Sequence, residues 1–168
     1  MKNRCLLVIC YCLLIFLSTC RINYSPIGVD IPVEAKTICI KQFQNNASLV
    51  NLKLSNELTT QLRDKFSSGT RLNLVDSKGD LHIEGEITGY SLSSIAPGAG
   101  MATMNRLTIT IRIKYENKFD EDKNLERTFS RFLDFDAGKS LQQEEETLVN
   151  QICELLVDDI FVATVGNW

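Results

Sequence analysis

The sequence predicts an α+β fold, a mostly antiparallel four- to five-stranded sheet with two helices packed on one face. Apolar residues recur at helical spacing in two segments, one before the central strands and one at the end of the chain. Between them, alternating apolar and polar residues predict strands with one dry face and one wet face. Because each helix has one apolar stripe, both helices are expected on the apolar face of the sheet, which leaves the other face open.

The chain begins with a segment that has the layout of an export signal. Lys2 and Arg4 precede the apolar run Leu6–Leu17, and small residues then lead to Cys20. As a helix this run rises about 18 Å, too little for a hydrocarbon core of about 30 Å. The ending resembles the lipobox of bacterial lipoproteins, which implies that Cys20 is lipidated and becomes the first mature residue. An ordinary cleaved secretory signal and an uncleaved anchor are the alternatives.

These features predict residues 1–19 as a signal peptide, residues 20–35 as the lipidated cysteine and a tether, and residues 36–168 as one α+β domain. The tether contains two prolines and a glycine and shows little periodicity. The whole chain has a net charge of −3, and loss of the basic signal makes it more acidic. This balance argues against general binding of nucleic acid.

The domain is expected to begin with a strand at Lys36–Phe43, in which Cys39 and Lys41 lie on the face opposite the isoleucines. The polar residues 44–46 then break the strand pattern.

An amphipathic helix follows, which begins near Asn51 or Ser55 and ends near Gly69. Its apolar stripe repeats every four residues and consists of Leu54, Leu58, Leu62 and Phe66.

The middle of the chain is rich in strand signals. Residues 71–75 predict a short strand and residues 76–80 a turn, after which a longer strand starts at Leu81. Gly85 and Gly89 fall on its apolar side, and the apolar register switches after Gly89. This predicts a β-bulge.

Residues 93–105 are small and flexible and predict a long hairpin loop, with a partner-contacting tip as the alternative interpretation. Leu107–Tyr115 shows the clearest alternation in the chain and predicts an antiparallel strand. Residues 117–124 form a charged turn, and Leu125–Phe135 returns as a further strand.

A long amphipathic helix closes the domain, and Ser140 with Gln143 forms a capping box at its start. Its apolar stripe consists of Leu141, Leu148, Ile152, Leu155, Leu156 and Ile160.

No group of residues in the sequence has the pattern of a catalytic, metal or cofactor site. We therefore predict that the protein is not an enzyme and binds neither a metal nor a cofactor. The one histidine, His82, has the pattern of a surface residue, and no phosphate loop, paired-cysteine motif or nucleophile elbow is present. The acidic run at 144–146 suits the dipole of a helix start. Cys39 and Cys153 remain for the folded domain, as buried small apolar residues or as a bridge.

The mature chain carries a set of short stretches, namely Ile22–Ser25, Ala35–Thr37, Leu72–Asp76, Gly79–Leu81, Glu84–Tyr90, Asn105–Thr110, Phe129–Arg131, Glu154–Phe161 and Asn167–Trp168. With the lipobox and the order of elements, they resemble the LptE-type lipopolysaccharide-assembly lipoproteins in the form found in Bacteroidota. The resemblance implies a non-enzymatic outer-membrane lipoprotein that plugs a large LptD-like β-barrel translocon. It also implies help in assembling that barrel and in delivering lipopolysaccharide to the outer leaflet.

The resemblance further implies contact with lipopolysaccharide through basic surface residues. An anionic glycolipid is best held by exposed Arg or Lys on a rigid surface. The candidates are Arg106, Arg112, Lys114, Arg127 and Arg131. Their alternative role is cross-strand pairing with Glu84 and Glu86.

A lipid on Cys20 would attach the domain to the membrane stably if it carries two or more acyl chains. No acidic run follows Cys20, so we expect the domain to face the periplasm. The alternative function is a stand-alone, periplasm-facing envelope lipoprotein that binds a small ligand or a cell-wall component.

Overall fold

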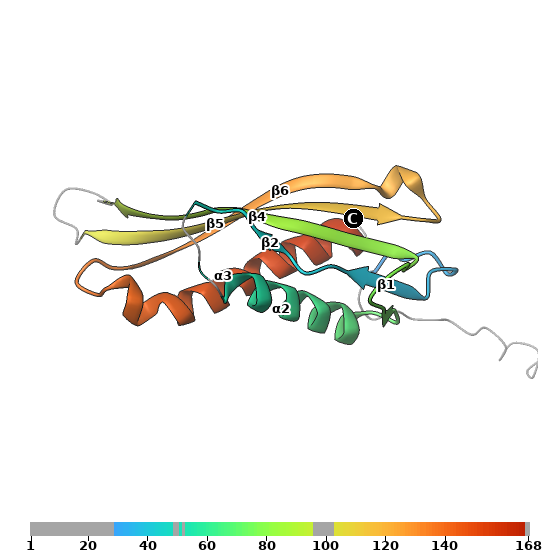
Figure 1. The fold of residues 1–168 in the computed structure, drawn as a ribbon, viewed down its shortest axis with the longest axis horizontal. Coiled ribbons are helices and arrows are strands. Elements are labelled where there is room, and N and C mark those ends of the chain that lie inside the picture. The colour runs from blue at the N-terminus through green and yellow to red at the C-terminus, as the bar shows by residue number, and fades with distance from the viewer. Residues whose placement is uncertain (1–28, 49–50, 52, 96–102, 167–168) are drawn as a thin grey trace, which may run out of the picture.

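The computed structural model describes residues 29–48, 51, 53–95 and 103–166. In chain order its elements are β1 (Thr37–Ile40), β2 (Gln44–Asn45), α2 (Leu54–Gly69), β3 (Asn73–Leu74), β4 (Leu81–Ile95), β5 (Met104–Asn117), the 3-10 turn η1 (Glu121–Lys123), β6 (Leu125–Asp136) and α3 (Leu141–Val165). Helices α2 and α3 lie on the same side of one sheet (Figure 1). The predicted α+β class is therefore confirmed. The predicted signal, Cys20 and the tether as far as residue 28 lie outside the described residues.

The sheet has long antiparallel ladders and, at one side, short parallel ones. Six strands of the described chain form it in the order β3-β1-β4-β5-β6, with β2 also paired to β4. β4, β5 and β6 are antiparallel neighbours, whereas β1 runs parallel to β3 and β4 and β2 runs parallel to β4. The expected mostly antiparallel sheet is therefore confirmed, with the correction that it has six strands and that β1, β2 and β3 add parallel pairings. Because α2 carries the chain back along the sheet between β2 and β3, β3 enters in the direction of β1.

Residues 44–46 do not end strand pairing as predicted. Gln44 and Asn45 form β2 opposite Glu86 and Ile87, and the Asn46 amide donates to the Ile87 carbonyl at 2.9 Å. A ladder uses backbone groups, so polar side chains at the edge of a sheet are compatible with it.

The predicted bulge is confirmed. The pairing of β4 with β5 shifts register between Ile87 and Gly89. Before the bulge Leu81, Ile83 and Ile87 are fully buried under the helices, and after it Tyr90 continues the buried row. The hairpin strands reach farther than predicted, to Ile95 and from Met104, so they occupy part of the predicted loop at 93–105. The middle of that loop, residues 96–102, lies outside the described residues.

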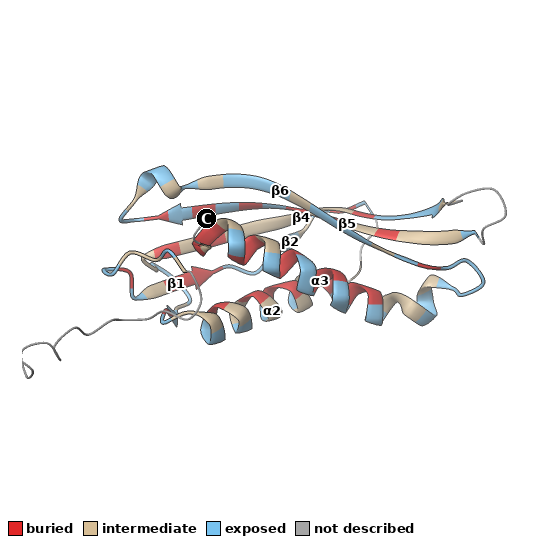
Figure 2. Ribbon diagram, turned by 180° about the vertical axis from the view of Figure 1, so that it is seen from behind, coloured by how far each residue is buried: buried red, intermediate tan, exposed pale blue. Residues whose placement is uncertain are grey.

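The core lies between the helices and the apolar face of the sheet (Figure 2). The α2 stripe Leu54, Leu58, Leu62 and Phe66 is fully buried, as predicted. Asn51 Oδ1 accepts the backbone amides of Lys53 and Leu54 and so begins this helix. The capping box of Ser140 and Gln143 is present at the start of α3. Phe66 of α2 and Phe161 of α3 pack together with ring centroids 5.1 Å apart.

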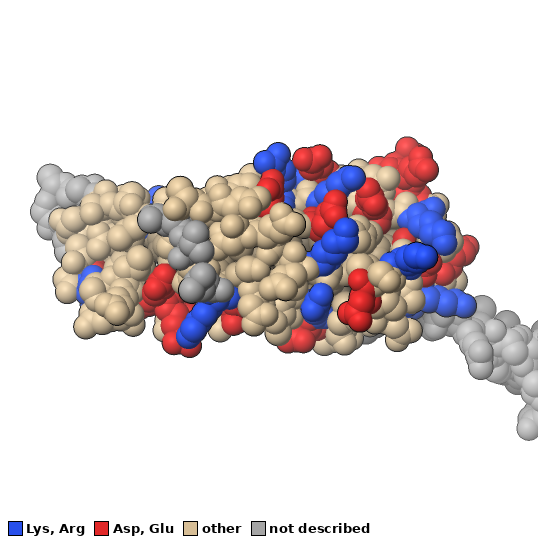
Figure 3. All heavy atoms as spheres, in the orientation of Figure 1, with Lys and Arg blue, Asp and Glu red and all other residues tan. Residues whose placement is uncertain are grey.

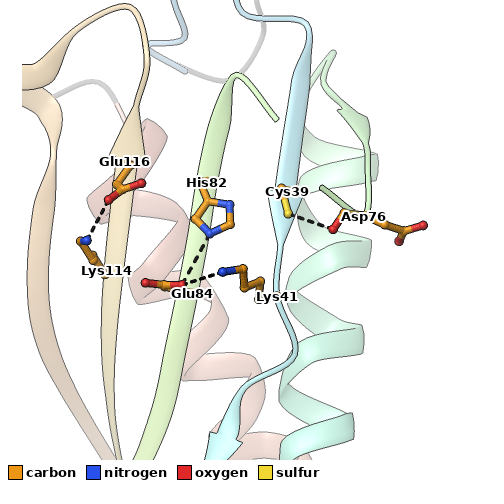
Figure 4. Close-up of polar contacts among 7 residues, drawn as sticks. All are labelled: Cys39, Lys41, Asp76, His82, Glu84, Lys114 and Glu116. Atoms are coloured by element: carbon orange, nitrogen blue, oxygen red, sulfur yellow. Dashed lines mark hydrogen bonds and ion pairs between the residues drawn. The ribbon is translucent and has the colours of Figure 1, made fainter. Parts of the chain in front are cut away.

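Cys39 and Cys153 are both free and buried, which matches the interpretation as small core residues and not the bridge. Cys39 lies on the polar side of β1, but the turn after β3 covers it, and its thiol donates to the Asp76 carbonyl at 3.4 Å (Figure 4). Burial raises the pKa of the Cys153 thiol to about 12, so this thiol stays protonated at neutral pH.

Candidate functional site

The sheet face away from the helices has a charged half and a half in which hydroxyl residues predominate beside one ion pair, Arg106 with Asp134. In the charged half, cross-strand neighbours of β4 and β5 are His82 with Glu116, Glu84 with Lys114, and Glu86 with Arg112. The cause is the alternation of each strand, which buries every second residue and leaves its neighbours on this face. Beyond the bulge the same face carries the hydroxyl residues Ser91, Thr108, Thr110 and Ser130 instead.

A shallow groove of about 380 Å³ lies in the charged half, between the segment that leads from β1 into β2, the strands β4 and β5, and the neighbouring end of β6. Its charged lining residues are Lys41, Glu84, Glu86, Arg112, Lys114 and Glu126. Arg112 contacts Glu86 at 2.8 Å, Lys114 contacts Glu116 at 2.8 Å and Lys41 contacts Glu84 at 3.0 Å. Figure 4 shows Lys41, which directly follows β1, converging with His82 on Glu84. The groove therefore offers three cations, each already facing a carboxylate.

Glu84, Glu116 and Lys114 stay ionised over the neutral pH range. The hydrogen bond from Lys41 holds the pKa of Glu84 below its usual value, and the bond from Lys114 does the same for Glu116. Glu116 in turn raises the pKa of Lys114. All these groups are largely exposed to solvent, where ion pairs are weak and screened by salt. An incoming anion can therefore compete with the glutamates for the three cations.

Arg106 lies on the same face but in the hydroxyl-rich half, about 20 Å along β5 from Arg112. Its guanidinium donates to both carboxylate oxygens of Asp134, at 2.7 and 2.9 Å, and lies 3.7 Å from the centre of the Phe132 ring. This two-sided contact fixes the arginine and neutralises it.

Arg127 and Arg131 lie on the helix side of β6 and not on the open face. They stand opposite the buried Ile113 and Ile109, which point toward the helices. Arg131 binds both oxygens of Asp159 in α3 at 2.6 Å and so ties the edge strand to the helix layer.

Of the five predicted cations, the structure thus brings only Arg112 and Lys114 together. Pairing with Glu86 follows the predicted alternative for Arg112, whereas Lys114 contacts Glu116 rather than Glu84. Lys41 is a member that sequence reasoning did not include. Its alternation with Cys39 indicated the polar face, but only the parallel pairing of β1 with β4 places it beside Glu84.

The described residues contain no group of three His, Cys, Asp or Glu side chains placed to hold a metal ion. In the same part of the chain, no helix combines the length and apolarity that a membrane span needs. His82 lies in the sheet with its Nε2 atom 3.6 Å from Glu84.

The arrangement of two helices on one face of a mixed sheet defines a class of α+β domain found in several solved bacterial proteins. A homologue of the putative neuraminyllactose-binding haemagglutinin from Helicobacter pylori matches with a TM-score of 0.53 and 11% identity, covering 83% of this chain and 88% of that one. A hypothetical protein from Chlamydia trachomatis matches with a TM-score of 0.51 and 7% identity, covering 77% and 98%. At these identities the likeness concerns the fold alone. No curated protein matches the sequence.

The family is given by the sequence of the domain itself. Residues 35–164 match the family model of LptE, lipopolysaccharide-assembly, and the chain belongs to this family.

Proposed function

We propose that this chain is an outer-membrane lipoprotein that plugs an LptD-like translocon β-barrel, helps to assemble it, and assists delivery of lipopolysaccharide to the outer leaflet. The observation that carries the proposal is the match to a lipopolysaccharide-assembly family across almost the whole folded domain. The lipobox-like leader and the open sheet face support it.

The place where the chain enters the fold supports this role. The first described residues are held against the C-terminal end of α3, where the Asp30 amide donates to the Val165 carbonyl at 2.7 Å. The Lys123 Nζ atom of η1 forms an ion pair with Asp30 Oδ2 at 2.6 Å. The chain thus enters the fold at the end opposite the one where β4 ends and β5 begins (Figure 1). A lipid on Cys20 would hold that entry end near the membrane, with the domain facing the periplasm.

The charged groove is the proposed contact for lipopolysaccharide. Phosphate and carboxylate groups of the glycolipid are strong acceptors for Arg and Lys. Arg112, Lys114 and Lys41 are held by the sheet and by their glutamate partners. Binding therefore costs little additional conformational freedom of these side chains.

Co-purification tests the function. Extraction of the native protein in mild detergent should recover a β-barrel protein several times its size, and depletion of the lipoprotein should lower both folded barrel and surface lipopolysaccharide. A protein that runs as a monomer, with barrel and surface lipopolysaccharide unchanged after depletion, would contradict the proposal. That result would favour the stand-alone binder, for which the groove on the open face is the available site.

The anchor is tested separately. Cys20→Ala should abolish palmitate labelling and release the domain from the membrane fraction, because no other lipid attachment is proposed. Cys12→Ala, which changes a cysteine inside the leader, is the matched control and should leave labelling intact. Labelling that survives Cys20→Ala would show that the lipobox interpretation is wrong.

A further inference from the structure

The outer part of β4 has a partner on only one side. Along its first half β4 pairs with β5 on one edge and with β1 and β2 on the other, and the last backbone bond on that second edge joins Asn46 to Ile87. From Thr88 to Ile95, β4 pairs only with β5 within the described part of the chain. This stretch is called the free β4 edge below.

The pairing pattern shows which backbone groups point outward there. Ile83 and Ile87, whose side chains face the helices, direct their carbonyls to Lys41 and Asn46 on the β1 and β2 side. In a strand, side-chain direction and backbone direction alternate together. After the bulge the helix-side positions are Tyr90, Leu92 and Ser94, so their amides and carbonyls face the free β4 edge. The amides of the residues between them point toward β5.

Natural edges are blunted by charged residues, prolines or bulges that point them away from other chains. The free β4 edge has one such feature, the bulge at its inner end between Ile87 and Gly89, and beyond that bulge it lacks the others. The eight residues Thr88–Ile95 contain no charge and no proline. The opposite edge of the same sheet, β6, contains five charged residues, namely Glu126, Arg127, Arg131, Asp134 and Asp136. One edge is therefore protected by charge and the other is not.

The surroundings of the free β4 edge specify what fits on it. Leu92 is 43% exposed on the helix side, and the hydroxyls of Ser91 and Ser93 lie on the open side. Charged side chains gather toward the other end of the molecule, and few are visible around this one (Figure 3). A strand that alternates apolar and uncharged polar residues complements such an edge, and strands of membrane β-barrels have this alternation.

We propose that the free β4 edge accepts an extended segment of the partner barrel, which adds a strand to this sheet beside Tyr90–Ile95. Backbone hydrogen bonds supply the affinity in this mode of recognition, and the side chains on the two faces supply the selectivity. The inference rests on the proposed function, since the occupant is a segment of the barrel, and it adds the surface through which the two proteins join.

Residue-resolved hydrogen exchange on the full-length lipoprotein, alone and in the co-purified complex, tests the pairing. The outward amides of Tyr90, Leu92 and Ser94 should exchange at least tenfold more slowly in the complex. The amides of Ser91 and Ser93, already bonded to β5, should change little, which makes them internal controls.

Substitutions provide a second test of the free β4 edge. Leu92→Lys and Ser94→Lys place a charge on the free β4 edge and should reduce recovery of the barrel at least fivefold. Thr128→Lys and Ser130→Lys add the same charge to the β6 edge and should leave recovery unchanged. Circular dichroism of each purified variant checks that the fold is retained.

The outcomes separate the two proposals. A barrel that co-purifies while the outward amides exchange as fast as in the free protein would overturn this inference and leave the proposed function standing. Protection that grows with the concentration of the isolated lipoprotein would overturn it in favour of pairing between two copies. If no barrel is recovered with the wild-type protein, both proposals fail.

Discussion

Gly85 is the residue at which the sheet has no room for a side chain. A Cβ atom there would overlap the ring of Phe43, which is 1% exposed and fixed between the sheet and α2. The Phe43 amide also donates to the Thr59 hydroxyl at 3.1 Å, so its backbone is held as well. The glycine therefore lets the large ring reach the centre of β4.

We expect Gly85→Ala to lower the free energy of unfolding by about 1–3 kcal/mol, because the added methyl must displace a buried ring. Urea denaturation measures the change. The double variant Gly85→Ala with Phe43→Leu should recover part of the loss relative to Phe43→Leu alone, since the smaller side chain frees the space. A wild-type denaturation midpoint for Gly85→Ala would show that the ring is able to move.

At the scale of elements, the helices and the β4–β5 hairpin were predictable from local pattern. The stripe from Leu54 to Phe66 and the capping box at Ser140 each depend on neighbours within a few residues, and the structure contains both. The bulge was predictable for the same reason, because the apolar register of β4 changes visibly at Gly89.

Elements set by distant parts of the chain were not predictable. Gln44 and Asn45 have no strand signal of their own and join the sheet only because β4 offers free backbone groups. The parallel pairing of β1 depends likewise on strands that follow some forty residues later, as in Ile38 with Leu81. This pairing also decides the candidate site, since it brings Lys41 to Glu84.

Sequence spacing also could not separate the predicted arginines. Arg127 and Arg131 lie close in sequence to residues of the open face, but the register of β6 against β5 turns them toward the helices. A one-residue change in register would have turned both arginines to the open face, because strand side chains alternate between faces.

At the scale of the whole molecule, the two ends of the sheet have different chemistry. The end where the chain enters carries the charged groove, and the hairpin end carries the uncharged free β4 edge (Figure 3). Under the proposed function, the first end binds the anionic glycolipid and the second joins the barrel. The two activities should then be separable by substitution, because the sites share no residue.

Binding of purified lipopolysaccharide to the full-length lipoprotein provides the measurement. Arg112→Ala with Lys114→Ala should weaken binding roughly five- to thirtyfold, since two exposed charge contacts of about 0.5–1 kcal/mol each are lost. Added salt should weaken binding to the wild-type protein and reduce the difference in affinity between the wild type and the double variant. Arg127→Ala, which removes a cation from the helix side of β6, is the matched control and should bind as the wild type does. If the double variant keeps full affinity, or if Arg127→Ala loses as much, the open face is not the glycolipid site.

Leu92→Lys should leave lipopolysaccharide binding unchanged while it reduces recovery of the barrel, because its position lies on the other half of the sheet.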